Sequence, residues 1–224
     1  MVRRAALGVV LVGMTVSHAR ADEPSSPPAP AAVPAPSKPA ADEGFSHEKQ
    51  FELSIRLALG LRGIAPYHDE YCGDIDNSAS NGFAPVCTGR SPFALDFELG
   101  YGVHRRIDLF LELRLGLEQD FGATPQASEG ARPFHVSPGA RFFFSEAGRA
   151  KVFTTAQLVL DFSGYKDPAG EKLGADFGIR NMNGLWFDLD RAYGFYAYVG
   201  DTASFARWLR FELEAGIGVQ GRYR

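Results

Sequence analysis

Hydrophobic and polar residues alternate strictly along several stretches of the chain, beginning at Phe51. From Phe51 to Leu61 every odd position is apolar, whereas the even positions from Glu52 to Arg62 are polar or small. A period of two places successive side chains on opposite faces of a β-strand. The stretch therefore predicts a strand of about eleven residues with one apolar and one polar face.

This alternation returns often enough to predict eight strands. The chain also holds 25 glycines, 18 phenylalanines and 8 tyrosines, a composition that favours an all-β fold with many turns. Strong alternation marks residues 93–103, 107–117 (with Phe110 as the exception) and 209–223, and weaker versions occupy 134–144, 151–163, 174–189 and 193–200.

The connections between the predicted strands alternate in length. Such alternation is typical of an outer-membrane barrel, with short periplasmic turns and longer external loops. We therefore predict an all-β, eight-stranded antiparallel up-and-down transmembrane barrel over residues 49–224, closed so that every backbone group is paired. The tight connections are 104–106, 145–150 and 190–192, and the longer ones are 64–92, 119–133, 164–173 and 201–207.

A soluble, lipocalin-like ligand-binding barrel is the main alternative, because its strands alternate equally well but carry the apolar face inward. Side-chain size argues against it. Small residues such as Gly60, Gly100 and Gly216 lie on the polar face, whereas the apolar face is nearly all Leu, Phe, Ile and Val. These large side chains would overfill the interior of eight strands.

If the polar face lines the lumen, charges of both signs meet there and can fill it as ion pairs. A solvated surface is the other interpretation of the same residues. The predicted lumenal network consists of Glu52, Arg56, Arg62, Asp96, Glu98, Asp108, Glu112, Arg114, Arg141, Arg180, Arg210, Glu212, Glu214 and Arg222.

The first 21 of the 224 residues have the pattern of a secretory signal peptide. Two arginines precede an apolar stretch, residues 5–16, and an A-x-A cleavage site ends at Ala21. About a dozen apolar residues fall short of the ~20 that a membrane-spanning helix needs. Cleavage leaves 20 Lys and Arg against 27 Asp and Glu, a net charge of −7, which disfavours a nucleic-acid partner.

A proline-rich segment follows the predicted cleavage site. Residues 22–44 hold seven of the chain's 14 prolines among Ala and Ser. This composition cannot bury enough apolar surface to fold. We predict that residues 22–48 form a disordered periplasmic tether, which could contact other periplasmic components.

The alternation, the loop pattern and the final strand WLRFELEAGIGVQGRYR are similar to those of eight-stranded outer-membrane barrels related to the membrane domain of outer membrane protein A. The resemblance covers about residues 50–224. It implies Sec-type export to the outer membrane of a Gram-negative-type cell, and contact with outer-membrane lipid and the barrel assembly machinery. A monomer is expected. Such barrels often end on an aromatic residue, whereas here Tyr223 is followed by Arg224.

Both cysteines of the chain lie in the first long connection. An exported protein meets an oxidising compartment, so Cys72 and Cys87 are predicted to form a disulfide. Metal binding is the weaker alternative, because no His pair accompanies them. Oxygen ligands in the same loop could bind calcium, but no known calcium-loop signature is present and solvated acidic residues explain them as well. They are Asp69, Glu70, Asp74, Asp76 and Asn77.

The sequence His135-Val136-Ser137 raises an enzyme hypothesis, since lipid A deacylases of the outer membrane are barrels that use a His, a Ser and a Glu. By alternation His135 and Ser137 face the lumen, away from an acyl chain, and Glu146 lies at the other end of the strand. We therefore predict no catalytic, cofactor-binding or metal-binding residues and no cofactor.

The favoured function is a structural or surface-interaction role with a lumen filled by side chains. Three alternatives stay open: a narrow channel for small solutes, the soluble ligand-binding barrel, and a lipid A-modifying hydrolase.

Overall fold

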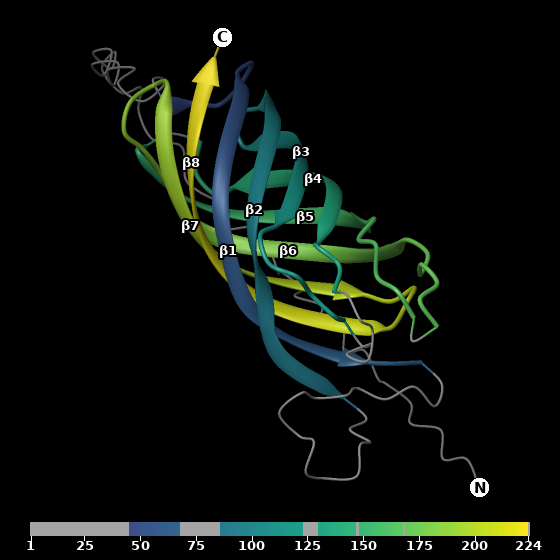
Figure 1. The fold of residues 1–224 in the computed structure, drawn as a ribbon. Coiled ribbons are helices and arrows are strands. Elements are labelled where there is room, and N and C mark those ends of the chain that lie inside the picture. Colours follow the sequence, from purple (N-terminus) through teal and green to yellow (C-terminus); the bar gives the residue numbers. More distant parts are fainter. Residues whose placement is uncertain (1–44, 68–85, 123–129, 147, 168, 224) are drawn as a thin grey trace, which may run out of the picture. The chain divides into compact units, whose positions relative to one another are not determined.

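The computed structural model describes residues 45–67, 86–122, 130–146, 148–167 and 169–223. In these ranges no helix is long and apolar enough to span a membrane. Eight strands run through them (Figure 1). The strands are β1 (Phe51–Ala65), β2 (Cys87–His104), β3 (Ile107–Gly116), β4 (Phe134–Phe143), β5 (Ala150–Asp161), β6 (Asp176–Asp188), β7 (Tyr193–Ser204) and β8 (Leu209–Tyr223).

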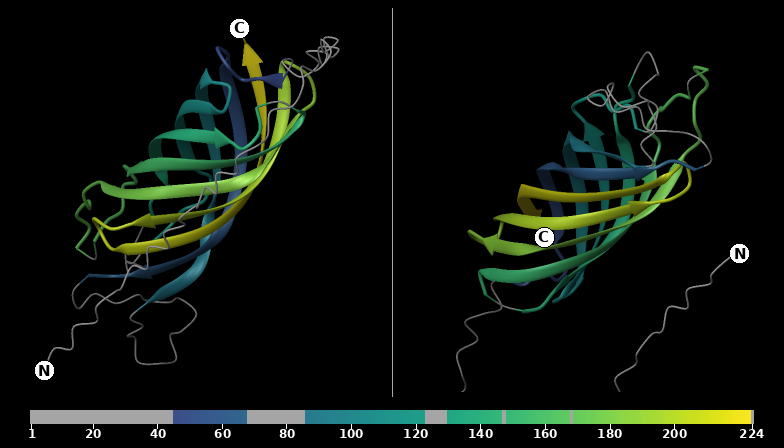
Figure 2. Two further views of the ribbon diagram at one scale, coloured as in Figure 1. Left: turned by 180° about the vertical axis from the view of Figure 1, so that it is seen from behind. Right: turned by 90° about the horizontal axis from the view of Figure 1, so that it is seen from below.

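The strands close into a barrel in chain order. Each strand pairs antiparallel with the next, and β1 closes the sheet by pairing with β8 along its whole length (Figure 2). The predicted fold class is therefore confirmed. The two ends of the barrel differ in their connections. The turn end carries the connections 105–106, 144–149 and 189–192, and the loop end carries 66–86, 117–133, 162–175 and 205–208.

Two connections differ by more than two residues from their predicted bounds. β2 begins at Cys87, so the first loop is 66–86 and not 64–92, because residues 87–91 pair with β1 beyond a register shift between Ala58 and Gly60. β7 continues to Ser204, because Asp201–Ser204 pair with β8. The fourth connection is therefore only 205–208, and the prediction of a longer loop at 201–207 is wrong. Backbone pairing extends these strands past the end of the hydrophobic alternation.

The apolar face of the barrel points outward. Leu53, Leu111 and Leu213 are 49%, 49% and 54% exposed, whereas the neighbouring Glu52 and Glu112 are 1% and 0% exposed. The polar face thus forms the interior, the reverse of a soluble barrel. Phe110, which breaks the alternation, is buried inside.

Inward-facing glycines make room for large rings. A Cβ atom at Gly216 or Gly218 of β8 would lie 2.5 Å from the ring of Tyr198 or Tyr196 of β7. Real Cβ atoms do not approach so closely, so only glycine admits these rings. The small residues on the polar face therefore leave space that large side chains fill.

Candidate functional site in the barrel lumen

All fourteen charged residues predicted for the lumen lie on the inner side of the barrel. Thirteen are at most 6% exposed. Arg62 is the exception, with a side chain that is 16% exposed near the loop end. The network continues through residues that the sequence did not single out, and it can be described as a central layer and two closures, one at each end.

Arg141 and Arg56 occupy the central layer. Arg141 of β4 lies 2.5 Å from Glu98 and 3.3 Å from Glu52. Arg56 of β1 donates to Asp96 at 2.8 Å and also to Glu112. Each guanidinium therefore meets two carboxylates from other strands, which compensates for its removal from water.

Arg114 and Arg180 extend this layer toward the loop end. Arg114 lies 2.7 Å from Asp96 and 2.8 Å from Glu214, and so connects these two carboxylates. Arg180 donates one hydrogen bond to Glu112 at 2.6 Å and another to the hydroxyl of Thr202 at 2.9 Å. Carboxylates shared between arginines link β1, β2, β3, β6 and β8 into one network across the lumen.

Aromatic rings fill the part of the lumen beside β4 to β7. The rings of Trp186 and Tyr196 stack at 4.6 Å, and Phe143 and Phe153 meet Trp186 edge-on. The Arg141 guanidinium lies 4.6 Å from the centre of the Trp186 ring. Cation–π contacts of this kind join the aromatic cluster to the charged network.

The chain segment before β1 closes the turn end. Residues 45–50 fold back against β2, where Lys49 donates a backbone hydrogen bond to Gly102 and Gly102 donates one to Gln50. A Cβ atom at Gly102 would lie 1.9 Å from the carbonyl oxygen of His47, so only glycine allows this approach. Residues 45–48 were predicted to belong to the tether. That boundary is corrected, because His47 is fully buried by partners inside the barrel.

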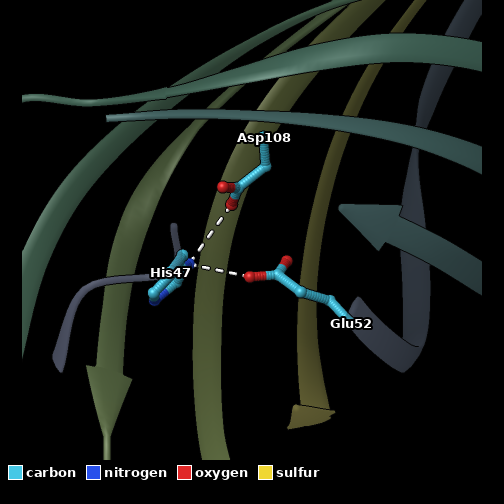
Figure 3. A group of neighbouring side chains, drawn as sticks. All are labelled: His47, Glu52 and Asp108. Atoms are coloured by element: carbon cyan, nitrogen blue, oxygen red, sulfur yellow. Dashed lines mark hydrogen bonds and ion pairs between the residues drawn. The ribbon is translucent and has the colours of Figure 1, made fainter. Parts of the chain in front are cut away.

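His47 is held by three carboxylates. Its Nδ1 lies 2.8 Å from Glu52 and 3.2 Å from Asp108 (Figure 3). Its Nε2 lies 3.6 Å from Asp188. Burial favours the neutral imidazole, but these carboxylates outweigh it and raise the pKa of His47 to about 9. His47 is therefore an imidazolium at neutral pH. Lys151 lies 2.9 Å from Asp188 and completes the closure.

The ligand atoms of His47, Glu52 and Asp108 lie within 4.8 Å of one another, as those of a metal site would. A divalent cation would have to displace the proton that these carboxylates stabilise on His47. It would also lie beside Arg141, which is 3.8 Å from Asp108. The charge balance thus favours an ion-paired imidazolium over a metal centre.

Asp120 organises the closure at the loop end. It binds Arg62, lies 3.3 Å from Arg210 and accepts a hydrogen bond of 2.6 Å from Tyr165. Burial would raise the pKa of Asp120, but the two arginines outweigh it and lower the pKa to about 2. The ring of Trp208 packs on Tyr165 at 5.4 Å. Next to this closure a cavity of about 10 Å³, lined by Arg114, Arg210 and others, offers roughly the space of one water.

His135 and Ser137 are both buried in the lumen, on the same face of β4. The carboxylate beside His135 is Asp161 of β5, 3.7 Å away, which the sequence did not suggest. Asp161 also binds Arg207 at 3.2 Å. Glu146 is exposed at the turn end and pairs with Arg106 at 3.0 Å. The structure therefore does not bring Glu146 to His135.

Sequence reasoning missed His47, Lys151, Asp188 and Asp120. Lys151 and Asp188 lie in β5 and β6, where alternate positions face the lumen. The alternation of these two strands could therefore have identified both residues as inward-facing. His47 and Asp120 lie outside the strands, where parity gives no signal. The acidic residues of the first loop and Cys72 lie outside the described residues, so the calcium and disulfide hypotheses stay predictions.

No family model and no curated protein matches the chain. Solved structures do resemble it. The N-terminal β-barrel domain of Pseudomonas aeruginosa OprF is 13% identical with a TM-score of 0.51, and the likeness covers 79% of this chain and 98% of that domain. Neisserial surface protein A is 15% identical, with a TM-score of 0.49 over 77% of this chain and 99% of that one. Ail of Yersinia pestis is 10% identical, with a TM-score of 0.45, and the likeness covers 79% of this chain and 99% of that one.

The first of these likenesses shows a shared fold. The chain is an eight-stranded barrel of the architecture found in outer-membrane barrels, which confirms the fold that the sequence resemblance implied.

Proposed function

We propose that this chain is an outer-membrane β-barrel with a structural or surface-interaction role and a lumen closed by its own side chains. The observation that carries this proposal is the polarity of the barrel. Exposed Leu, Ile, Val and Phe side chains surround it, whereas buried ion pairs fill it. An outer face of this kind is stable in lipid and would be costly in water.

The chain ends and connections support the orientation of the proposed barrel. Both the closing segment 45–50 and the end of β8 lie at the turn end, where short turns face the periplasm in outer-membrane barrels. The signal peptide, Sec-type export, recognition by the barrel assembly machinery and the tether through residue 44 belong to this proposal. The longer connections would then face the cell exterior and carry any surface interaction.

The filled lumen favours this role over a channel. A solute would have to pass the closure around Asp120, the arginine layer and the closure around His47 in turn. Eight strands leave an interior just wide enough for side chains to fill. Hydrolysis of lipid A is also disfavoured, because His135 and Ser137 are buried in the lumen and not exposed to an acyl chain.

Lipid-attached quenchers test the proposed polarity. A fluorescent probe is placed on single cysteines at Leu111 and Leu113 and, as matched controls, at Glu112 and Glu212, in a chain without its native cysteines. Quenchers on lipid tails should dim the probes at the leucine sites and spare those at the glutamate sites. A chain that fractionates with the periplasm, with leucine sites untouched by lipid quenchers, would overturn the proposal.

A further inference from the structure

The outward face of the barrel is not uniformly apolar. Thr154 of β5, Asn181 and Asn183 of β6 and Asp201 of β7 all point outward, and Asn183 is exposed. They are neighbours across the sheet, because Asn183 pairs with Thr154 and Asn181 pairs with Asp201. These four residues are called the polar patch.

The polar patch lies at the middle of the apolar belt. Asn181 and Asn183 are each four residues from an aromatic residue on the outward face of β6, Phe177 on one side and Phe187 on the other. A tilted strand rises roughly 2.5 Å per residue along the membrane normal, so the asparagines lie about 10 Å from each ring. That depth is near the midplane of a band about 25 Å tall, where lipid offers no hydrogen-bond partner.

Bonds within the patch leave part of its polarity unmatched. Asn181 donates to the backbone oxygen of Thr155 at 2.5 Å and to the Thr154 hydroxyl at 3.3 Å. Asn183 donates to the side-chain oxygen of Asn181 at 2.5 Å. Among the described residues, the Asn183 side-chain oxygen and the Asp201 carboxylate accept no hydrogen bond. The Asn183 side-chain amide uses one N–H in its bond to Asn181, so one N–H donor and the oxygen acceptor are left.

The patch has small neighbours on β5 and β7. Ala156 of β5 pairs with Asn181, and Ala197 of β7 faces outward two residues from Val199, which pairs with Asn183. The outward face of β3 carries Leu109, Leu111 and Leu113 instead. Small side chains with a few polar groups are the composition by which membrane-embedded surfaces approach one another closely.

We infer that β5 to β7 form an interface with a second copy of this chain in the membrane, a conclusion that rests on the proposed outer-membrane location. The depth of the patch excludes a water-soluble partner. A second copy, related by a two-fold axis along the membrane normal, presents the same amide at the same depth. The free N–H of each Asn183 can then donate to the Asn183 oxygen of the other copy, as a self-complementary interface requires. This dimer replaces the monomer expected from the sequence.

Cross-linking in liposomes of the purified protein tests the dimer. Val199 pairs with Asn183 and is 64% exposed, so Val199→Cys places a thiol beside the patch, whereas Leu111→Cys on β3 places one on the opposite side of the barrel. Both are made in a chain without its native cysteines. A short bis-maleimide should link two copies through position 199 and not through position 111.

Asn183→Leu, in the Val199→Cys chain, tests the chemistry of the interface. This change removes a polar group from lipid, so the barrel should fold as well as before. The association constant should fall by about tenfold, as expected for the loss of two reciprocal amide contacts. Ile179→Leu, on the same face of β6, is the matched control and should leave association unchanged.

Lipid-tail quenching of probes at both sites separates failure of the dimer from failure of the membrane location. Quenching at position 111 with protection at position 199 supports the dimer. Equal quenching at both sites without cross-links overturns the dimer and leaves the membrane location standing. No quenching at either site overturns the membrane location and the dimer with it.

Discussion

Each buried charge in the lumen depends on several partners at once. Arg141 illustrates this, because its guanidinium binds Glu98 and Glu52 and also lies over the ring of Trp186. Replacing a whole buried ion pair by apolar groups can be neutral, but removing one partner leaves an uncompensated charge at a cost of about 3–5 kcal/mol. A single substitution in this network should therefore lower the free energy of unfolding by much more than the net contribution of the whole ion pair.

The stability of the barrel should decrease as pH rises through the titration of His47. The pKa of His47 is about 9 in the folded chain, against 6.5 for an unperturbed histidine. A raised pKa gives stability that is fully present below pH 6.5 and is lost as pH rises toward about 9. The loss should be of the order of 3 kcal/mol. It can be measured by urea unfolding in detergent micelles at a series of pH values.

His47→Gln is the control for this prediction. Glutamine keeps a polar side chain at the closure but does not titrate, so the variant should be less stable than the parent at pH 6 and should show no loss between pH 6.5 and 9. If both chains lose stability equally over that range, another group is responsible.

The alternation of hydrophobic and polar residues predicts which charges face inward but not which charges meet. Glu112 and Glu52 were assigned to the lumen from alternation alone, whereas their partners Arg180 and Arg141 come from distant parts of the chain. Such pairings depend on strand tilt and on how the barrel closes, which no local pattern contains. His47 had no periodic signal at all.

At the scale of elements, the segment 45–50 packs against β2 at Gly102 and is hydrogen-bonded to it there. Gly102→Ala should displace this segment, because the added Cβ would lie 1.9 Å from the His47 oxygen. The Lys49 amide, which donates to the Gly102 oxygen at 2.7 Å, should then exchange its hydrogen faster, while the strand amides stay protected. Hydrogen-exchange NMR in micelles measures both.

Gly89→Ala is the matched control on the same strand, because a Cβ at Gly89 meets no atom within 4 Å. Lys49 exchange should be unchanged in this variant. Equal acceleration in both variants would mean that alanine weakens β2 in general and that no specific contact is lost.

The first loop should be bridged between Cys72 and Cys87. Cys87 is the first residue of β2, and Cys72 lies outside the described residues. A bridge over 16 residues would restrict the unfolded loop by ~3 kcal/mol in the chain-entropy model. Alkylation of protein purified from membranes, followed by mass spectrometry, should find no free thiol before reduction. Two labelled cysteines would reject the bridge.

Element bounds were predicted well where alternation is strict and less well where it ends. β8 has its predicted limits, 209–223. β2 and β7 are longer than predicted, because their outer ends continue to pair with β1 and β8 through residues that show no alternation, such as Thr88 and Thr202. Backbone hydrogen bonds decide the length of a strand there, and composition does not.

At the scale of the whole barrel, three obstructions lie in series along the lumen. The closure around Asp120 lies at the loop end, the arginine layer lies in the middle, and the closure around His47 lies at the turn end. β1 contributes to all three, through Glu52, Arg56 and Arg62, and Glu52 pairs with both His47 and Arg141. The pairs Arg56–Asp96 and Arg62–Asp120 do not involve the segment 45–50. Loss of the closure around His47 should therefore leave the other two obstructions in place.

The barrel should accordingly conduct no ions, either as the parent chain or as the Gly102→Ala variant with its turn-end closure displaced. A hydrated ion would have to separate Arg56 from Asp96 and Arg141 from Glu98, whose charges are fully buried and matched. Planar bilayers containing either purified chain should show no stable current steps. Reproducible steps in Gly102→Ala alone would mean that the turn-end closure is the only barrier. Steps in both chains would show an open lumen and would support the channel in place of the structural role.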